Sequence, residues 1–599
     1  MRLGIKGVAI LGMLCATACS GTPGDSSSGS SGSPEASTGA STGGASTTAG
    51  PTGGSSTGGN ASTGASSSGG TSGASASSTG APGTTTGAGS ASAGSTSSAS
   101  TGAATTGGGS TSAGGSSSAS ASSGSSSGGT GTGLALSPFF GMTTTTTSIY
   151  PQVTYGVQRF WDSPPFQWQT LQTAACADIT ACANGYDKNN MASFDAYLAQ
   201  LLTNGVTEAI YTMARTPYFI TSGQNDTSCN YSTVANGACD RPSDLNADGS
   251  GTNQTFRMWY AFFASRLNDP TYLTTHAHVR YWEIWNEPDT AAFWGDGSGG
   301  AGSYAALVRM TEDMRCMLTG NGVVHNYGAN GPVPCAQAGL PATGIDPSAL
   351  ILMPSYHAEP ASLTQMQNFL YCTSTSRNCN TGSAGAAAVD VINMHMKPGA
   401  VCTPNGAGTN CTAATSVEPA YAGYIANVQS YLQAAELAKP IWDDEASYAP
   451  SGFAAPYTDA DMAASWIPRF LLVGWSLGVQ SHDWYTWDKG LNAYPLAVTA
   501  WDTTASWIAG ATLSAPCQAV GSSQVFSCTI DKGGTSYEIL WDASQSCSGG
   551  SCTTNPYAVG AGFKTYADIA GNAPQNVGSC TGCKSDEVPL GVKPLLLAP

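Results

Sequence analysis

Between about residue 134 and residue 507 the chain alternates short apolar runs with longer segments whose apolar positions recur every three or four residues. A bounded run of four to eight apolar residues is typical of a buried strand, whereas a spacing of three and four is typical of an amphipathic helix. Regular alternation of the two predicts an α/β chain with a parallel sheet. Strands are predicted at residues 139–142, 155–160, 207–213, 279–285, 350–353, 389–394, 440–444 and 479–484.

Eight strands separated by helices match a (β/α)8 (TIM) barrel, which we predict for residues 134–507. After about Trp507 the pattern changes to short strands separated by turn residues, without helical spacing. This change predicts a small all-β, sandwich-like domain at residues 508–599. The predicted helices are 191–203, 256–267, 304–317, 421–438 and 460–472, and the predicted C-terminal strands are 528–530, 536–542, 562–566 and 588–597.

The first nineteen residues have the pattern of an export signal. Arg2 and Lys6 precede an apolar run at residues 7–14, and small residues lead up to Cys19. The run is far shorter than the roughly 20 residues that span a bilayer. Residues 16–19 are similar to a bacterial lipoprotein cleavage box, which implies a lipid on Cys19. An ordinary cleaved signal peptide with free secretion is the alternative.

Residues 20–133 consist almost wholly of Ser, Gly, Thr and Ala, with Asp25 and Glu35 as the only charged side chains. Nothing apolar in this segment offsets an ordering cost of about 1–2 kcal/mol per residue. We therefore predict a disordered, flexible tether. A coil of this length has a mean reach of roughly 60 Å, enough to hold a folded module away from a surface.

The amino-acid composition limits the classes of partner that the chain is expected to bind. The formal net charge is −17, only 10% of the residues are charged, and Lys and Arg form no cluster. This argues against nucleic acid and anionic lipid surfaces, so contact with a membrane would come only through a lipid on Cys19. The 14 Trp and 24 Tyr residues suit a neutral carbohydrate, whose C–H faces stack on aromatic rings, although most of these rings are expected in the core. We expect a monomer that binds carbohydrate.

Sixteen of the eighteen cysteines follow Cys19, and they fall into eight local couples. An even number in an exported chain favours disulfides, although spacing alone does not fix the connectivity. The Cys580/Cys583 couple has no second Cys pair or His nearby, so a zinc site is not expected. The couples are Cys176/Cys182, Cys229/Cys239, Cys316/Cys335, Cys372/Cys379, Cys402/Cys411, Cys517/Cys528, Cys547/Cys552 and Cys580/Cys583.

One further motif resembles a metal site. Asp244, Asn246 and Asp248, followed by Gly249, match the front half of a calcium loop. The twelfth position, which needs a bidentate Glu, is Thr255. We therefore predict a turn at this segment rather than a calcium site.

One predicted strand ends in polar residues with catalytic potential, in the sequence Tyr-Trp-Glu-Ile-Trp-Asn-Glu-Pro-Asp at residues 281–289. Glu283 and Glu287 share one parity of a period-two strand with Tyr281, so the inward face should lead to Glu287. Pro288 removes a ladder donor and is expected to end the pairing. Catalytic groups collect at the carboxyl ends of parallel barrel strands.

A second carboxylate is expected at the end of another buried strand. The seventh strand runs into Asp443-Asp444-Glu445, from which we choose Glu445, with the two Asp residues as competitors. The two segments together resemble the clan A retaining glycoside hydrolases, barrels in which Asn-Glu-Pro ends strand four and a Glu ends strand seven. The resemblance implies that Glu287 is the acid/base, that Glu445 is the nucleophile, and that Asn286 hydrogen-bonds the 2-hydroxyl of the sugar.

Other strand ends extend this resemblance, which is closest to the family 39 β-xylosidase-like enzymes. Arg159 at the second strand matches the Arg that lies beneath the nucleophile and keeps its carboxylate ionised. His395 ends the sixth strand, where the clan usually has His-x-Tyr. Lys397 stands here in place of that Tyr, and Tyr448 is our candidate to substitute for it.

Two more positions follow from the same resemblance. Trp487, in preference to Trp484, is assigned to the aromatic platform under the sugar at the cleavage point. A core role is the competing interpretation for either ring. His357, just past the fifth strand, is a weaker candidate for the site.

The resemblance thus predicts an exported, lipid-anchored retaining β-glycosidase that needs no cofactor. Glu445 would attack the anomeric carbon while protonated Glu287 donates to the leaving oxygen, and Glu287 would then deprotonate water. This role calls for a raised pKa of Glu287, from burial or from the nearby charge of the nucleophile. The competing hypotheses are a surface adhesin or glycan-binding barrel without catalysis, and a structural scaffold stapled by disulfides.

Overall fold

The computed structural model describes residues 133–599 apart from short gaps. The signal segment with Cys19, the tether at 20–132 and Tyr448 lie outside the described residues. None of the helices in the described part of the chain is both long and apolar enough to cross a bilayer. The gaps are residues 162, 230–234, 327–330, 342, 359, 374–375, 380–384, 398–399, 405–408, 414–415 and 448–458.

All eight predicted barrel strands are present, and each pairs in parallel with its neighbours. The sheet runs in the order β7-β4-β3-β2-β1-β13-β12-β9-β8, in which β7 and β8 are successive parts of the fifth barrel strand. A parallel bridge from Leu352 to Val391 joins this strand to the sixth and closes the ring. The strands are β1 (Phe140–Thr143), β2 (Val157–Phe160), β3 (Glu208–Thr212), β4 (His278–Glu283), β7 (Leu350–Leu352), β8 (Tyr356–His357), β9 (Ile392–His395), β12 (Ile441–Ala446) and β13 (Val479–Trp484).

The inside of the ring is filled in layers, because alternate residues of each strand point inward. The apolar layer includes Val157, Ile210, Tyr281 and Trp442, of which the last two pack ring against ring at 4.8 Å. Two residues farther along the same four strands stand Arg159, Thr212, Glu283 and Asp444, all buried. The period of two therefore predicts that a polar layer lies directly on the apolar one, at the carboxyl ends of the strands.

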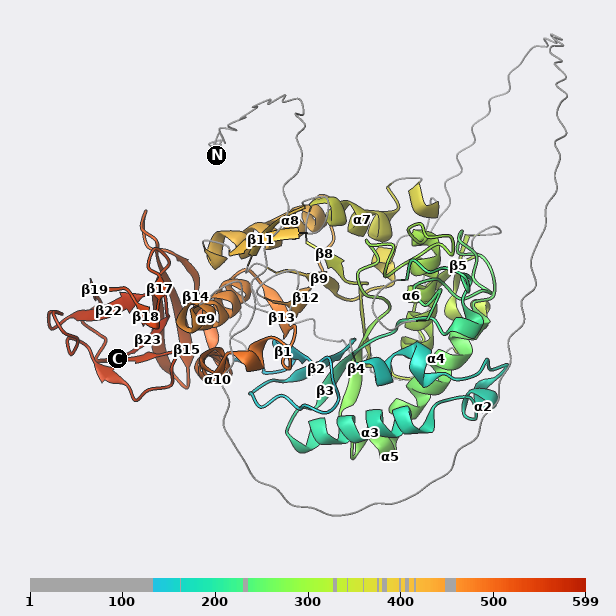
Figure 1. Cartoon of the computed structure of the whole chain (residues 1–599), viewed down its shortest axis with the longest axis horizontal. Helices are drawn as coiled ribbons and strands as arrows, with labels where there is room; N and C mark the ends of the chain where they lie inside the picture. The colour runs from blue at the N-terminus through green and yellow to red at the C-terminus, as the bar shows by residue number, and fades with distance from the viewer. Residues whose placement is uncertain are drawn as a thin grey trace, which may run out of the picture. The chain divides into compact units, whose positions relative to one another are not determined.

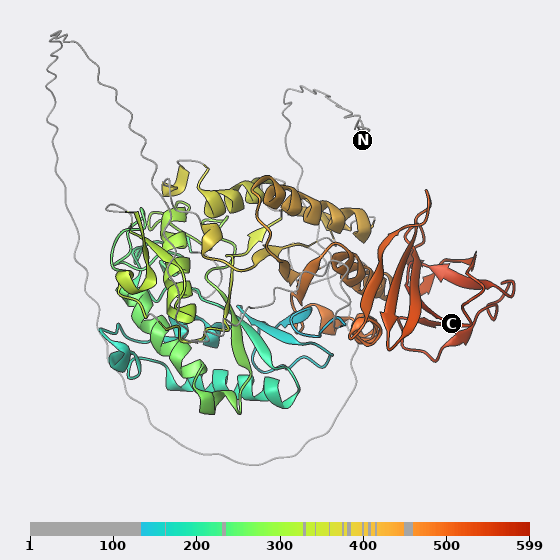
Figure 2. The same cartoon turned by 180° about the vertical axis from the view of Figure 1, so that it is seen from behind.

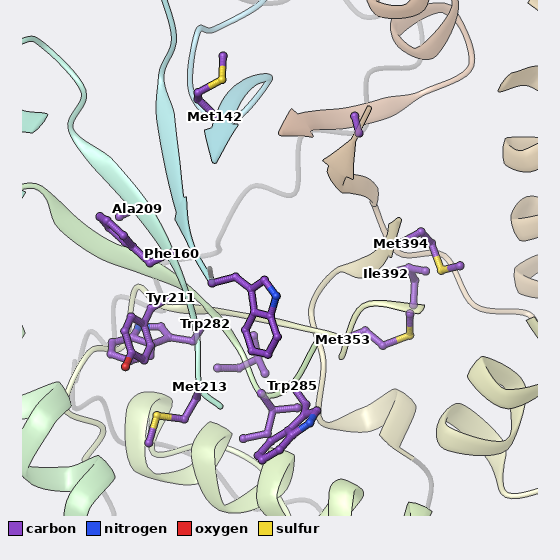
Figure 3. Packing of buried hydrophobic residues seen from close by; sticks show 14 of the residues in the cluster. Met142, Phe160, Ala209, Tyr211, Met213, Trp282, Trp285, Met353, Ile392 and Met394 are labelled. Carbon is purple, nitrogen blue, oxygen red and sulfur yellow. The ribbon is translucent and has the colours of Figure 1, made fainter. Parts of the chain in front are cut away.

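Helices surround the strands, as Figures 1 and 2 show from opposite sides. Their apolar faces pack on the outward side chains of the strands. For example, the ring centres of Tyr211 and Trp282 lie 5.7 Å apart (Figure 3). Both rings also contact Phe263 of α4. The five predicted helices are present, together with α7 and α10. The long helices are α3 (Lys188–Thr203), α4 (Gln254–Leu267), α6 (Tyr304–Thr319), α7 (Pro360–Tyr371), α8 (Val417–Ala434), α9 (Ala460–Ser476) and α10 (Pro495–Ile508); the short ones are α1 (Trp168–Leu171), α2 (Ile179–Cys182) and α5 (Pro270–Leu273).

After α10, residues 512–598 form antiparallel strands without a helix, as the sequence predicts. A six-stranded sheet has the order β14-β15-β16-β23-β20-β21, and its inner residues share a core with β22 through Leu540, Val588 and Leu597. The strands are β14 (Thr512–Ala519), β15 (Val525–Lys532), β16 (Thr535–Asp542), β17 (Cys547–Ser548), β18 (Ser551–Cys552), β19 (Thr554–Ala558), β20 (Thr565–Asp568), β21 (Gln575–Asn576), β22 (Glu587–Gly591) and β23 (Leu595–Ala598).

Seven of the eight predicted cysteine couples form disulfides. The side chains of the eighth couple lie outside the described residues, but the backbones of Cys402 and Cys411 stand opposite each other in a hairpin. This hairpin, β10 (Ala400–Pro404) with β11 (Thr409–Ala413), and a second one, β5 (Val323–Asn326) with β6 (Gly331–Pro334), are insertions that the pattern did not predict.

The segment that resembles a calcium loop has the hydrogen bonds of a turn. The Asp248 carboxylate accepts from the backbone N–H of Ser250 at 2.9 Å, and the N–H of Asn246 donates to the Ser250 carbonyl at 2.7 Å. The Asp244 carboxylate accepts from Thr252 and from the N–H of Thr255. Two of the carboxylates that a calcium ion would need are thus used within the loop itself.

Candidate active site

The two predicted carboxylates lie at the same end of the barrel, on strands that the fifth and sixth strands separate. Glu445 belongs to β12, whereas Glu287 lies four residues beyond the end of β4 at Glu283. Although β4 itself ends at Glu283, pairing with the fifth strand continues through a parallel bridge from Asn286 to Ser355 and stops at Pro288, as predicted. Glu287 has a φ of 44°, a left-handed conformation that is uncommon outside Gly, and its N–H donates to the Ser355 carbonyl at 2.9 Å. The fifth strand thus fixes the turn that carries Glu287.

One oxygen of Glu287, one oxygen of Glu445 and one ring nitrogen of His395 all lie within 4.8 Å of one another. His395 spans the two carboxylates, with Nδ1 at 2.7 Å from Glu287 Oε1 and Nε2 at 3.4 Å from Glu445 Oε2. Glu287 is 6% exposed and Glu445 is 4% exposed. The pair is therefore shielded from bulk water, which strengthens every charge interaction between its members.

Arg159 lies beneath the two carboxylates and is fully buried. Its guanidinium donates to Glu445 Oε2 at 3.1 Å, to Glu283 Oε2 at 2.9 Å and to Asn286 Oδ1 at 2.8 Å, and its Nε lies 2.8 Å from Asp444 Oδ2. Because the amide oxygen of Asn286 accepts from Arg159, its nitrogen is the end that remains to donate to a ligand. Arg159 thereby orients two of the predicted site residues at once.

The three successive acids of β12 point to different places. Asp443 accepts from the N–H of Met396 and from the hydroxyl of Tyr421 on α8, each at 2.9 Å. Asp444 accepts from Asn393 at 2.6 Å and belongs to the layer below the site. Glu445 is the member of the three that approaches Glu287. The geometry therefore separates the residue we chose from its two competitors.

Several carboxylates surround His395 and favour its charged form. Its Nε2 also lies 3.3 Å from Asp444 Oδ1. Burial acts to lower the pKa of His395, but the charge of Glu445 and the contacts with Asp444 and Glu287 raise it to about 9. An imidazolium at this position donates to Glu287 through Nδ1 and lies within ion-pair distance of Glu445.

Glu287 is surrounded by positive charge, which the sequence did not predict. His357 Nε2 lies 2.9 Å and Lys397 Nζ lies 3.6 Å from Glu287 Oε1, in addition to His395. Burial acts to raise the pKa of Glu287, but His357, Lys397 and the imidazole hydrogen bonds outweigh it and lower the pKa well below its ordinary value. The expectation of a raised pKa is therefore wrong for the free protein.

His357 has a larger part in the site than its weak signal in the sequence indicated. Its Nδ1 lies 2.9 Å from Asp289 Oδ2, so the imidazole bridges Asp289 and Glu287. Burial acts to lower the pKa of His357, but these two carboxylates raise it to about 11. The Glu-x-Asp spacing of Glu287 and Asp289 in the sequence is the signal that could have pointed to this contact.

Lys397 occupies the place where the resemblance expects a Tyr. Its Nζ donates to Glu445 Oε1 at 2.8 Å, and it lies 5.5 Å from the centre of the Tyr485 ring. In the sequence, Lys397 is recognisable only as a departure from the His-x-Tyr pattern. A lysine two residues beyond an inward-facing His at a strand end was the available signal, because both side chains share one face.

The two candidate tryptophans differ in what they contact. Trp484 packs outward against the helices, 5.9 Å from the Phe470 ring of α9 and 6.3 Å from the Trp501 ring of α10. Trp487 is buried three residues after β13, where its backbone N–H donates to the Thr143 carbonyl at the end of β1 at 2.8 Å. The outward packing of Trp484 leaves Trp487 as the candidate for the platform.

The Glu287, His395 and Glu445 side chains also have the donor types of a metal site. The same oxygens, however, accept from Arg159, Lys397 and His357. Cations already fill the positions from which a carboxylate would bind a metal ion, so these donors do not fit a resident metal.

No family model matches the chain, and no curated protein is similar to it in sequence. Solved structures with a similar arrangement include a monomeric β-xylosidase from Caulobacter crescentus CB15 (14% identity, 69% of this chain and 75% of that chain, TM-score 0.40). A second is a GH39 enzyme from Xanthomonas axonopodis pv. citri (14% identity, 78% of this chain and 95% of that chain, TM-score 0.46). A third is a GH30 endoxylanase from Clostridium papyrosolvens C71 (11% identity, 78% of this chain and 97% of that chain, TM-score 0.41). The barrel assignment rests on the strand order and ring closure of this chain itself.

Proposed function

We propose that this protein is a retaining β-glycosidase that hydrolyses carbohydrate by double displacement. The observation that carries the proposal is the approach of Glu287 and Glu445 to within 4.8 Å, from the ends of the fourth and seventh barrel strands. Retaining glycosidases hold their two carboxyl groups about 5–5.5 Å apart, whereas inverting enzymes leave about 6.5–9.5 Å for a water molecule. The short separation supports the retaining mechanism.

In the first step Glu445 attacks the anomeric carbon, and the bond from that carbon to the leaving oxygen breaks. Arg159 holds Oε2 of Glu445, which leaves Oε1 as the attacking atom once the substrate displaces Lys397 from it. Glu287 donates its proton to the leaving oxygen, and the Asn286 amide donates to the 2-hydroxyl of the sugar.

In the second step Glu287 takes a proton from water, and the resulting hydroxide releases the sugar from Glu445. The cations around Glu287 favour its ionised form, which suits this base role. The first step instead needs the protonated form, so we expect the acid-catalysed step to favour an acidic pH.

The experiment that tests the proposal is turnover of aryl β-glycosides and plant polysaccharides by the wild type and by Glu287→Gln and Glu445→Gln. Loss of a positioned acid/base typically costs about 10²–10⁴ in kcat, and loss of the nucleophile at least as much. Circular dichroism and Tm check that both variants fold. An active Glu445→Gln beside an inactive Asp444→Asn contradicts the nucleophile assignment, and a glycan-binding barrel without catalysis leaves every substrate intact.

Reaction with azide distinguishes the acid/base role of Glu287 from the nucleophile role of Glu445. An aryl leaving group of low pKa needs little protonation, so Glu287→Ala should still form the glycosyl-enzyme, and azide should release it as the β-azide. In Glu445→Ala the azide enters from the opposite face and gives the α-azide. The reverse assignment of products would overturn the roles, and inversion by the wild type excludes double displacement.

We also propose that the protein is exported and carries a lipid on Cys19. The seven disulfides in the described residues support an oxidising compartment. Labelled palmitate should enter the wild type and not Cys19→Ala, and the variant should move from the membrane fraction to the soluble fraction. Equal labelling of the two proteins contradicts the lipid anchor.

A further inference from the structure

Two buried carboxylates lie close together in the loops at the carboxyl end of the barrel, apart from the residues of the proposed active site. Asp226 and Asp240 belong to the loop that follows β3, and one oxygen of each lies within 4.8 Å of the other. Asp240 is fully buried, and Asp226 is 7% exposed. The proposed glycosidase chemistry uses neither of them, so their burial needs another explanation.

The loop that follows β4 packs against both carboxylates. The backbone N–H of Gly297 donates to Asp240 Oδ1 at 2.8 Å. The backbone N–H of Gly299 donates to Asp226 Oδ2 at 3.2 Å. Gly295 has no room for a side chain, because an added Cβ would lie 2.4 Å from Asp240 Oδ1 and 3.5 Å from Asp226 Oδ2. The two loops therefore meet at this pair of carboxylates.

No cationic side chain balances the charge of the pair. In the described part of the chain neither carboxylate forms an ion pair, and Oδ2 of Asp240 is buried without a hydrogen-bond partner. Arg241 is next in the sequence, but its guanidinium donates to the backbone carbonyls of Leu245 and Asp296. Burial and the charge of Asp226 raise the pKa of Asp240 to about 7. Because most buried polar atoms in folded proteins have a partner, the Asp240 oxygen indicates an additional ligand.

The donor atoms of this cluster suit calcium. Calcium binds carboxylate, carbonyl and water oxygens at about 2.3–2.6 Å, so two oxygens within 4.8 Å of each other can share one ion. The sulfur atoms of Cys229 and Cys239 belong to the same cluster but are joined in a disulfide, which leaves no thiolate for a softer metal such as zinc. Calcium also tolerates irregular geometry, whereas magnesium demands a near-ideal octahedron.

We propose that Asp226 and Asp240 bind a calcium ion that joins the loops following β3 and β4. Backbone carbonyls of these loops and water complete the set of ligands. The loop after β4 also carries Glu287, so the ion stabilises the segment that positions the proposed acid/base. The site is separate from the turn at residues 244–249, whose carboxylates accept hydrogen bonds within the turn itself.

Calcium binding is measured on the full-length protein after treatment with EDTA, without any substrate. We would titrate CaCl2, MgCl2 and ZnCl2 separately by isothermal titration calorimetry, and record Tm in EDTA and in about 10 mM CaCl2, above the Kd of about 10⁻⁴–10⁻³ M that is typical of extracellular modules. The variants are Asp226→Asn and Asp240→Asn, with Asp248→Asn in the calcium-like turn as the matched control. Hydrogen exchange of the wild type, with and without calcium, shows which backbone segments the ion protects.

We expect one calcium ion per chain, a rise in Tm of several degrees, and slower exchange at residues 223–229 and 295–299. Asp240→Asn keeps the acceptor for Gly297 but removes one of two like charges. This variant should lose at least about tenfold in calcium affinity and most of the rise in Tm, yet be no less stable than the wild type in EDTA. A carboxylate with a merely structural role would instead cost the same stability with and without calcium. Asp248→Asn should bind calcium as the wild type does.

Several outcomes would overturn the proposal and leave the glycosidase function untouched. They include a wild type that does not bind calcium, and unchanged binding in both Asp226→Asn and Asp240→Asn. Loss of binding in Asp248→Asn alone would place the ion in the turn. Tighter binding of zinc than of calcium, or binding that first needs a thiol to reduce the Cys229–Cys239 disulfide, would assign the site to sulfur donors. Should neither variant fold, the wild type still decides, because calcium that protects neither loop from exchange does not bind there.

Discussion

At the scale of single residues, the site depends on how charge is distributed around Glu287. Its carboxylate is placed by a left-handed turn and contacts three cationic side chains, from His357, His395 and Lys397. The acid form of Glu287 is the one that protonates a leaving group, so the neighbours that lower its pKa also limit the pH range of the first step.

We predict that His357→Gln moves the basic limb of the kcat/KM profile to higher pH. Glutamine keeps a hydrogen-bond donor but removes the positive charge that lowers the pKa of Glu287, so the acid form persists to higher pH. The pH profile on a substrate with a poor leaving group measures the limb. Asp289→Asn is the matched variant: it leaves the imidazole in place but weakens its charge, and should shift the limb in the same direction by less. A limb that stays in place or moves to lower pH contradicts the charge argument.

Much of this residue-level arrangement is predictable from the sequence, because it depends on strand parity and on the Asn-Glu-Pro motif at residues 286–288. Val157 and Arg159, or Tyr281 and Glu283, share a face at a spacing of two, and the ring brings these faces together. The bridging contact of His357 depends instead on the turn after β4, whose conformation no pattern predicts. The lowered pKa of Glu287 was not predictable for the same reason, since it depends on side chains at the ends of the fifth and sixth strands.

At the scale of elements, the barrel strands were predictable because their apolar runs are short and bounded, and they are buried on both faces. The two hairpins β5–β6 and β10–β11 were not, because their strands have only four or five residues without a bounded apolar run, and their pairing is local. The regular strand β4 ends at Glu283, but its pairing with the fifth strand continues as an isolated parallel bridge from Asn286 to Ser355, so Pro288 marks the end of the pairing.

A buried contact links elements of the barrel to the C-terminal strands. Glu418 at the start of α8 accepts from Arg469 of α9 at 2.6 Å and 2.7 Å, and from the indole N–H of Trp541 in β16 at 2.6 Å. All three side chains are buried. Burial acts to raise the pKa of Glu418, but the charge of Arg469 outweighs it and lowers the pKa below its ordinary value.

We predict that Glu418→Gln lowers the free energy of unfolding by about 3–5 kcal/mol at pH 7, because it leaves the Arg469 charge unpaired. A carboxyl with a depressed folded-state pKa stabilises above its unfolded pKa of about 4.3, and this stabilisation is lost as the pH falls through the folded value. The gap between wild type and variant in urea titrations should therefore narrow below about pH 4.3. Lys593→Met is the control: it breaks a partly exposed pair with Asp461 across the same elements and should cost about 1 kcal/mol or less. An equal loss of unfolding free energy in the two variants would contradict the claim that burial makes the Glu418–Arg469 pair more important than the exposed one.

At the scale of the whole molecule, the proposed site lies at the carboxyl ends of the barrel strands. The beginning of the described chain is instead hydrogen-bonded to the segment that follows α10. The N–H of Leu134 donates to the Ala511 carbonyl, and the N–H of Gly510 donates to the Leu134 carbonyl, each at 2.7 Å. The chain just before β1 is thereby joined to the segment that follows α10. Within the part of the chain that the structure describes, the members of the proposed site all follow residue 158.

We predict that deletion of residues 1–130 leaves kcat and KM within about twofold of the full-length values, because the predicted tether carries no chemistry. Deletion of residues 1–138 is the matched comparison. It removes both Leu134 hydrogen bonds and the contact of Ser137 with Glu208, and each backbone bond is worth about 1 kcal/mol. The longer deletion should therefore lower Tm and the free energy of unfolding while the shorter one does not. Activity on soluble aryl glycosides and thermal unfolding measure the two effects separately. A large fall in kcat after the shorter deletion would show that the tether contributes to catalysis, and equal Tm values for the two proteins would show that the Leu134 contacts do not stabilise the barrel.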